Sequence, residues 1–467
     1  MEAVIDKEVV GAGNVHPVEE RPPLSRLIPL GLQHVLVMYA GAVAVPLILG
    51  GAFKLPKEQI AMLINADLIC CGLVTLIQSL GIGKGIGIRL PVMMGVSFAA
   101  VTPMLAIGTE LGITTVFGSV IAAGIIGFLA APVVSRMVRF FPPVVTGSII
   151  AVIGISLMRV AVFWAAGQAM IKNAEGQMVP NPAHGDPVNL TIAFIVLLSV
   201  MLIAKYGKGF VANIAVLLGL IIGFLISLAL GKVNFAGTSA QPWIDIVYPF
   251  QFGFPEFHAV PIITMTMVMF VIMVESVGMF LALGELCGRP ATQDDITRGL
   301  RVDGLGTIVG GVFNTFAYTS FSQNVGLVGV TGVRSRWVTV MGGIIILCFG
   351  LFPKVAHVVA SIPQFVLGGA GIVMFGMVAA TGIRILSRVN FDNRHNALII
   401  AVSIGVGMIP LIADKFFHHF PKALAPLLHS GILLAAIAAL LLNLFFNGLQ
   451  GAEEAQREAA ASTHGAE

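Results

Sequence analysis

Long apolar runs separated by short polar breaks make up most of this chain of 467 residues. A helix that crosses the hydrocarbon core of a bilayer needs about 20 apolar residues. Eleven runs predict spanning helices, centred on Leu27–Leu49, Ile60–Leu80, Ile113–Val133, Val144–Ala161, Val188–Ala204, Val211–Leu230, Ile262–Leu283, Val338–Phe352, Val366–Ile383, Asn396–Ile412 and Leu427–Phe446. Three more stretches, Leu90–Ile107, Leu300–Phe313 and Thr315–Gly332, are long enough only if their backbone is irregular. The pattern therefore predicts an all-α polytopic membrane protein of 14 transmembrane segments.

Two stretches combine apolar residues with closely spaced Gly, Pro, Ser and Thr. They are Pro91–Pro103 and Phe316–Gly332. Irregular backbone at membrane depth is tolerated only where protein encloses it or where it lines a cavity. We therefore expect short extended stretches in segments 3 and 10, beside a ligand site. Tight helix packing on the Gly and Ser faces is the alternative, but it leaves Gln323 and Asn324 unexplained.

These two stretches hold the third place in successive groups of seven segments. A second matched pair, Phe141–Gly147 and Ile362–Gly369, holds the fifth place in each group. Because seven is odd, the two groups enter the membrane from opposite sides, which is the inverted repeat of many secondary transporters. The expected divisions are an N-terminal tail at 1–25, a first repeat at 26–230, a second repeat at 258–446 and a C-terminal tail at 447–467.

Composition and charge agree with a membrane location. Apolar residues make up 57% of the chain and charged residues 10%, whereas roughly a quarter of the residues in soluble domains are charged. The net charge of +3 does not indicate a nucleic-acid partner. With the N-terminus inside and 14 crossings, inner loops receive fourteen Lys and Arg residues and outer loops eight. By the positive-inside rule we expect both termini to be cytoplasmic.

Few ionisable residues lie within the predicted spans, where such residues are costly and usually functional. Glu275 has mostly apolar neighbours on both sides. A carboxyl group that desolvation holds near neutrality could carry a proton and could accept a hydrogen bond from a ligand N–H; structural pairing with a His or an amide is the alternative. His34, beside Gln33, fits an interhelical hydrogen bond, Asp303 fits either a structural or a functional role, and Asp67 is expected to be structural.

The second interrupted stretch carries an amide that could recognise a ligand. Gln323 offers both a donor and an acceptor, which complement the adjacent N–H and C=O groups on an oxopurine edge. Asn324 could instead tie the broken segment to its neighbours. If half-helices begin at Phe98 and near Val325, their backbone N–H groups could bind carbonyl oxygens of a planar ligand, and Phe98 also offers an aromatic face.

Motifs for an enzyme, a metal site or a cofactor site are absent from the sequence. It contains no HExxH, no GxSxG with partners and no Walker loop. Its four cysteines have no metal-binding spacing. We therefore expect no enzymatic activity, no metal and no cofactor.

The run Gln323-Asn324-Val325-Gly326-Leu-Val-Gly-Val-Thr331-Gly332 fits a family signature. That signature reads Gln, Glu or Pro, then Asn, any residue, Gly, four residues of any kind, Thr, and Arg, Lys or Gly. On this run, on Gln33-His34 and on Glu275, the chain resembles the nucleobase–ascorbate transporter (nucleobase:cation symporter-2) family from about Leu24 to Gln450. The runs Gly31–Pro46 and Arg301–Gly304 resemble its bacterial urate and xanthine permeases.

This resemblance implies a core domain and a gate domain, assembled into homodimers in the bacterial inner membrane. It implies that Glu275 and Gln323 hydrogen-bond a nucleobase, and that backbone at Phe98 and near Asn324 and Val325 completes the pocket. Ser97 occupies a position that varies with substrate. His34, Asp303 and Asn324 would be polar residues of the core domain that transport needs.

The function that the resemblance implies is proton-coupled import of urate, xanthine or both by alternating access. Gln323 favours a purine, because uracil-type members carry Glu there. Gly332 is common in xanthine carriers, whereas urate carriers tend to have Arg, so the choice between these purines stays open. The alternatives are a uracil-type or other nucleobase carrier, an anion exchanger of the same fold, a passive channel and a sodium-driven carrier.

Overall fold

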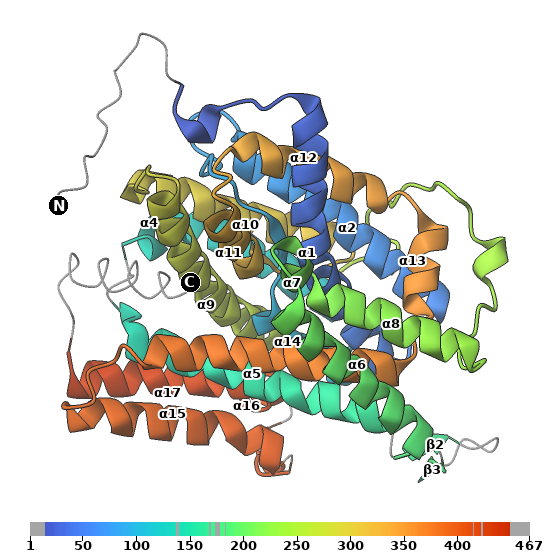
Figure 1. Cartoon of the computed structure of the whole chain (residues 1–467). Coiled ribbons are helices and arrows are strands. Elements are labelled where there is room, and N and C mark those ends of the chain that lie inside the picture. Colours follow the sequence, from blue (N-terminus) through green and yellow to red (C-terminus); the bar gives the residue numbers. More distant parts are fainter. Residues whose placement is uncertain are drawn as a thin grey trace.

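The computed structural model describes residues 15–136, 140–167, 170–172, 178–182, 184–413, 415–421 and 424–448. Most of both predicted tails, at 1–14 and 449–467, lies outside the described residues. Arg139 and Lys422, which contribute to the charge count of the loops, lie outside them as well. The described chain is mostly helical, as the apolar runs predict (Figure 1).

The first half of the chain runs to the end of α8. Its elements are η1 (Pro17–Glu19), α1 (Leu24–Ala52), α2 (Lys57–Leu80), β1 (Met94–Val96), η2 (Phe98–Ala100), α3 (Val101–Leu111), α4 (Ile113–Val134), α5 (Pro143–Ala166), β2 (Met170–Lys172), β3 (Met178–Pro180), α6 (Pro187–Tyr206), α7 (Phe210–Asn213) and α8 (Ala215–Ala229). β2 and β3 pair as a small antiparallel hairpin.

The second half follows a long connection that contains η4 (Thr238–Ala240). Its elements are α9 (Ala259–Leu286), α10 (Gln293–Val312), β4 (Tyr318–Ser320), α11 (Ser322–Thr331), α12 (Arg336–Phe349), α13 (Pro353–Ala360), α14 (Gln364–Leu386), α15 (Arg394–Ile412), α16 (Ala425–Leu428) and α17 (Gly431–Phe446).

The helices differ in whether they are long enough to cross a membrane. Among the described residues, eight helices are long and apolar enough to cross a membrane, or nine if the pair α12 and α13, bent by 82°, is one span. The apolar helices Phe98–Leu111, Ala215–Ala229 and Gly431–Phe446 are shorter. The protein is thus a multi-pass membrane protein, while the count of 14 segments depends on including short and broken ones.

One sequence prediction about backbone regularity is wrong. Leu300–Phe313 was expected to be irregular, but it lies in the continuous helix α10. This helix begins with a capping box, in which Thr292 and Asp295 bond each other's backbone N–H groups. Its glycines do not break the helix; instead, a Cβ at Gly304 would overlap the backbone of Phe128 on α4. At Gly304 the absence of a side chain allows the two helices to approach closely.

The two interrupted stretches meet near the centre of the molecule. β1 pairs antiparallel with β4, with Met94 opposite Ser320, Gly95 opposite Thr319 and Val96 opposite Tyr318. Two flanking bonds extend the ladder, because Ser97 N–H donates to Ala317 O (2.8 Å) and Phe321 N–H donates to Met93 O (2.9 Å). The prediction that each interrupted stretch contains a short extended piece is confirmed. A half-helix follows each strand and starts from this ladder.

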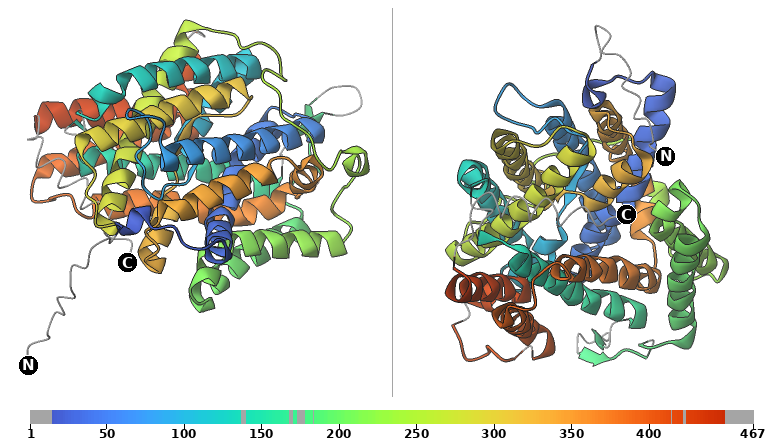
Figure 2. Two further views of the ribbon diagram at one scale, coloured as in Figure 1. Left: turned by 90° about the horizontal axis from the view of Figure 1, so that it is seen from above. Right: turned by 60° about the vertical axis from the view of Figure 1, so that its left-hand side comes forward.

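The helices pack as two groups, each drawn from both halves of the chain. One group contains α5, α6, α8, α14, α15 and α17, and the other contains α1, α2, α4, α9, α10 and α12. α5 against α14 is the most extensive helix pair. Figures 1 and 2 show α5, α14, α15 and α17 together on one side of the molecule, away from α1, α2 and α12.

Candidate functional site

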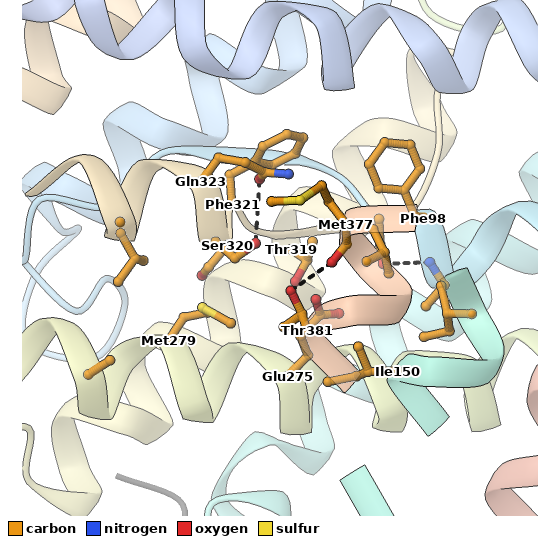
Figure 3. Close-up of a pocket in the computed structure, with 18 of the residues that line it drawn as sticks. Phe98, Ile150, Glu275, Met279, Thr319, Ser320, Phe321, Gln323, Met377 and Thr381 are labelled. Atoms are coloured by element: carbon orange, nitrogen blue, oxygen red, sulfur yellow. Dashed lines mark hydrogen bonds between the residues drawn. The ribbon is translucent and has the colours of Figure 1, made fainter. Parts of the chain in front are cut away.

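A cavity of about 490 Å³ lies where the β1–β4 ladder faces α9 and the helix pair α5–α14. This volume falls within the range of small-molecule sites, roughly 300–1,000 Å³. Figure 3 shows side chains from α9, α11 and α14 pointing into it. The polar side chains that line it are Ser97, Glu275, Thr319, Ser320, Ser322, Gln323, Thr381 and Arg384. Most other lining side chains are apolar, as is usual for a ligand pocket.

Glu275 comes from α9, one of the longest helices. It lines the cavity with Met279, Ala282 and Leu286, at successive spacings of four, three and four residues. This spacing defines a single helix face that runs from the middle of α9 to its last residue. Glu275 is the one carboxyl group among the residues that line this cavity. The most conspicuous intramembrane acid in the sequence therefore faces the cavity.

The two ends of the strand ladder supply the opposite wall. Ser97 and Phe98 follow β1, and Gln323 lies in the first turn of α11 after β4. All three line the cavity together with Val325, although more than 220 residues separate Ser97 from Gln323 in the sequence. The ladder brings the paired interruptions of the two halves to one place, as the sequence pattern predicts.

The start of α11 sharpens the expectation about backbone donors near Val325. The N–H groups of Asn324 and Val325 already donate to Phe321 O, at 3.2 and 3.4 Å. Helix starts leave their first N–H groups without an intrahelical acceptor. The first N–H groups of α11, those of Ser322 and Gln323, belong to residues that line the cavity, two to three residues earlier than expected.

Asn324 and His34 form a pair behind the cavity wall and do not line the cavity. The Asn324 amide nitrogen donates to His34 O (2.9 Å) and lies 3.1 Å from His34 Nδ1. Both residues are buried. This contact ties the broken segment to α1, as the second interpretation of Asn324 anticipated.

Asp303, on α10, is buried behind the β4 segment. Its carboxyl oxygens make no hydrogen bond of good geometry within the described chain, although the Ser276 hydroxyl group lies near enough to interact with them. It interacts electrostatically with Glu275, and Ser276 links this region to β4 through a 3.1 Å contact with the Thr319 hydroxyl. A buried carboxyl group at membrane depth is costly when ionised, so Asp303 stays a candidate for a functional role.

Asp67 has a different setting. Its Oδ1 accepts hydrogen bonds from the hydroxyl groups of Tyr318 (2.7 Å) and Thr315 (3.1 Å). The Cys71 thiol lies 3.7 Å from Oδ2. This buried carboxyl anchors the segment leading into β4 to α2 and does not line the cavity. The structural interpretation of Asp67 agrees with these contacts.

Sequence reasoning missed the wall that α5 and α14 supply. Ile150 and Ile153 reach the cavity from α5, and Met374, Met377 and Thr381 reach it from α14. Most of these residues are apolar in apolar helices, so nothing in the pattern distinguishes them from lipid-facing residues. Only Thr381 and Arg384, polar residues one turn apart in an apolar run, offered a signal.

Metal chemistry has no obvious place in this cavity. Among the described residues, no group of three or more His, Cys, Asp and Glu side chains could hold a metal ion. The lining offers hydrogen-bond donors and acceptors, two aromatic rings at Phe98 and Phe321, and a single carboxyl group. Such a set suits a small, planar, polar molecule.

A multi-pass helical protein with a central cavity between two helix groups, reached by two broken segments, has the architecture of a membrane transporter. A family model described as a permease family matches residues 25–416. The chain therefore belongs to this family of transporters, which confirms the resemblance seen in its sequence. It is not an enzyme.

Relatives cover almost the whole chain. The uric acid transporter UacT of Escherichia coli K12 is 55% identical over 456 residues, covering 96% of this chain and 92% of UacT. The xanthine permease of Bacillus subtilis 168 is 44% identical, covering 94% of this chain and 98% of the permease. The uric acid permease PucJ of the same organism is 42% identical, covering 90% and 93%.

Similar solved structures share the fold at low sequence identity. The transmembrane domain of the cyanobacterial bicarbonate transporter BicA has a TM-score of 0.58 and 15% identity, covering 90% of this chain and 97% of that domain. The murine anion transporter Slc26a9, in its inward-facing state, has a TM-score of 0.58 and 12% identity, covering 91% and 69%. At such identities the likeness concerns the fold alone.

Proposed function

We propose that this protein is a proton-coupled symporter that imports an oxopurine, urate or xanthine, across the bacterial inner membrane by alternating access. The observation that carries the proposal is the meeting of Glu275 and Gln323 in one cavity. The names of the relatives, which are urate and xanthine carriers, support the same substrate class.

Substrate recognition would follow from the cavity lining. The Gln323 amide donates one hydrogen bond and accepts another, matching neighbouring C=O and N–H groups of an oxopurine. Glu275 accepts from a second N–H group. The N–H groups at the starts of η2 and α11, near Phe98 and Gln323, bind the carbonyl oxygens of the base, because helix starts favour negative partial charge. The Phe98 ring supplies an apolar contact to the flat face, and Ser97 adjusts the fit at its edge.

Proton coupling would use the buried acids. An ionised carboxyl group at membrane depth is costly, so Glu275 crosses in its protonated form when the substrate is bound. Asp303 exchanges protons with it, and the pair Asn324–His34 holds α11 in register. Sodium coupling would need several oxygen ligands around one point, and in the described cavity Glu275 is the single carboxyl group.

The moving parts would be the two helix groups. We take α1–α4 and α9–α12 as the core domain and α5–α8 and α14–α17 as the gate domain, with 26–230 and 258–446 as inverted repeats. The cavity extends to the C-terminal ends of α9, α11 and α14, where Leu286, Val330 and Ile385 line it. Arg289 and Arg336 gather near this end around Glu19. With basic residues inside, this conformation opens to the cytoplasm.

The direct test is uptake by the purified protein in liposomes. With an inward proton gradient, labelled urate or xanthine should accumulate. A protonophore, which abolishes the gradient, should stop the accumulation. Failure of both purines to accumulate would refute the proposal. Equal flux with and without the gradient would indicate a passive channel, and dependence on sodium ions would indicate a sodium-driven carrier.

Glu275→Gln should abolish accumulation, because an amide cannot take up and release the proton. The substitution also puts an NH₂ donor in the place of one carboxyl oxygen, which is an acceptor. The matched control is Glu285→Gln on the same helix, since Glu285 is exposed and does not line the cavity. Uptake by this control should equal that of the wild type. Unchanged accumulation in Glu275→Gln would remove Glu275 from the mechanism.

A further inference from the structure

The wall of the cavity formed by α14 combines four apolar residues with two polar ones. Six of its residues line the cavity, at spacings of three, one, three, three and one: Met374, Met377, Val378, Thr381, Arg384 and Ile385. They form one face of the helix. Arg384 is exposed and lies in the last turn of the helix, so Thr381 is the polar residue of this face that lies farther from the helix end (Figure 3).

The hydroxyl group of Thr381 has a fixed orientation. Its Oγ1 donates to Met377 O, one turn earlier in α14, at 2.9 Å. A threonine hydroxyl has a single hydrogen, so the oxygen lone pairs are what remain for a ligand. The β-branched side chain has few rotamers in a helix, which holds the oxygen in place. Thr381 therefore offers the cavity an oriented hydrogen-bond acceptor.

This acceptor lines the same cavity as Glu275 and Gln323 but comes from another part of the fold. Those two residues come from α9 and α11, whereas Thr381 comes from the separate helix group of α5 and α14. An oxopurine carries N–H groups on more than one edge. A base whose first edge bonds to Glu275 and Gln323 turns another edge toward α14, where an unbonded N–H would lose its solvation.

We infer that Thr381 accepts a hydrogen bond from an N–H group of the bound purine that Glu275 and Gln323 do not bind, and that it thereby helps to select among oxopurines. The inference rests on the proposed function. It also assigns the gate side of the protein a part in recognition, since this contact forms only while both helix groups enclose the substrate.

The experiment compares Thr381→Val, which keeps the shape and removes the hydroxyl group, with Thr381→Ser, which restores it. The matched control is Thr191→Val on α6, because Thr191 makes the same bond to the carbonyl oxygen four residues earlier, at 2.7 Å, and lies outside the cavity. Inhibition constants are measured in liposome uptake for urate, xanthine, hypoxanthine and singly N-methylated xanthines, with inserted protein quantified.

Thr381→Val should weaken inhibition about 3- to 10-fold for purines that carry the critical N–H, the loss of one neutral hydrogen bond. For the analogues that lack this N–H, Thr381→Val and the wild type should be equal. Thr381→Ser and Thr191→Val should follow the wild type throughout. A structural role would instead change every inhibition constant by one common factor.

Three results would overturn the inference. The first is a change of every inhibition constant in Thr381→Val by one common factor. The second is inhibition constants in Thr381→Val equal to those of the wild type. The third is a weakening of inhibition that Thr381→Ser does not reverse. If the wild type takes up neither urate nor xanthine, the proposed function fails and the inference fails with it. Normal uptake by the wild type together with any of the first three results rejects the role of Thr381 alone.

Discussion

At the scale of single residues, the acidic side chains within the helices differ in how many hydrogen-bond partners they have. Asp67 is surrounded by donors that hold β4 against α2, whereas Asp303 has only the Ser276 hydroxyl group near it and makes no hydrogen bond of good geometry within the described chain. Glu275 is half-buried and reaches the cavity. A carboxyl group saturated with donors stabilises structure, while one without partners is free to exchange protons or bind ligand. The local contacts therefore separate roles that the sequence left open.

Removing the Asp67 carboxyl group should destabilise the protein without touching the cavity lining. Asp67→Ala leaves the hydroxyl groups of Thr315 and Tyr318 without this acceptor, at a cost of about 1–3 kcal/mol. Tyr318→Phe should cost less, because it removes one donor. Thermal unfolding in detergent measures both. The double variant should lose less than the sum of the two single losses, since the residues share one bond; full additivity would show that the bond contributes nothing.

At the scale of elements, α5 and α14 depend on small residues. A Cβ at Gly154 would overlap the backbone N of Ala379, and a Cβ at Gly382 would overlap the backbone N of Ala151. A Cβ at Gly368 would overlap Ala165 in the same way. Close backbone approach of this kind drives association of helices in membranes, where the hydrophobic effect is absent.

Gly154→Ala should therefore lower the stability of the protein, by about 1–3 kcal/mol for an overpacked contact. The matched control is Gly405→Ala on α15, because a Cβ at that exposed position meets nothing within 4 Å. Alanine favours a helix over glycine by about 1 kcal/mol, so the control should keep or raise stability. Equal melting temperatures for the two variants would contradict close packing at Gly154.

Elements also show how far the sequence could be interpreted. Ser97, Phe98, Glu275 and Gln323 were predicted to share a site because polar groups and broken backbone stand out within apolar runs. Ile150, Met374 and Met377 carry no such signal, since their position depends on how α5 and α14 pack. The stretch Leu300–Phe313 is predicted from its length to be irregular, although it is helical and its Gly304 accommodates α4. Glycine in a membrane segment can thus mark either a break in the helix or a close helix contact, and a single sequence does not distinguish the two.

At the scale of the whole molecule, charges gather at one end of α2. The loop after its last residue contains Gly85, whose carbonyl oxygen accepts from Arg301 (2.9 Å). Arg336 donates to Ser79 O (2.8 Å) at the same end. At the other end, Lys57 donates to Asn234 O (2.7 Å) in the connection between the two halves. With 24 residues, α2 is long enough to separate these ends by the thickness of a membrane.

Single cysteines at exposed Lys84 and Lys232 should therefore react from opposite sides. In a background without the exposed Cys348, a membrane-impermeant maleimide should label Lys232→Cys in intact cells. Lys84→Cys should react only after the membrane is permeabilised, because the end richer in arginine faces the cytoplasm. The reverse pattern would invert the proposed orientation, and labelling of both in intact cells would contradict a complete crossing by α2.

The ladder between β1 and β4 has an evolutionary consequence. It joins the two halves of the chain through main-chain atoms, which every residue except proline supplies in full. Side chains beside the ladder can be substituted without loss of its main-chain hydrogen bonds, so a new substrate selectivity can arise one side chain at a time. A protein assembled in this way can diverge in cargo far sooner than it diverges in architecture.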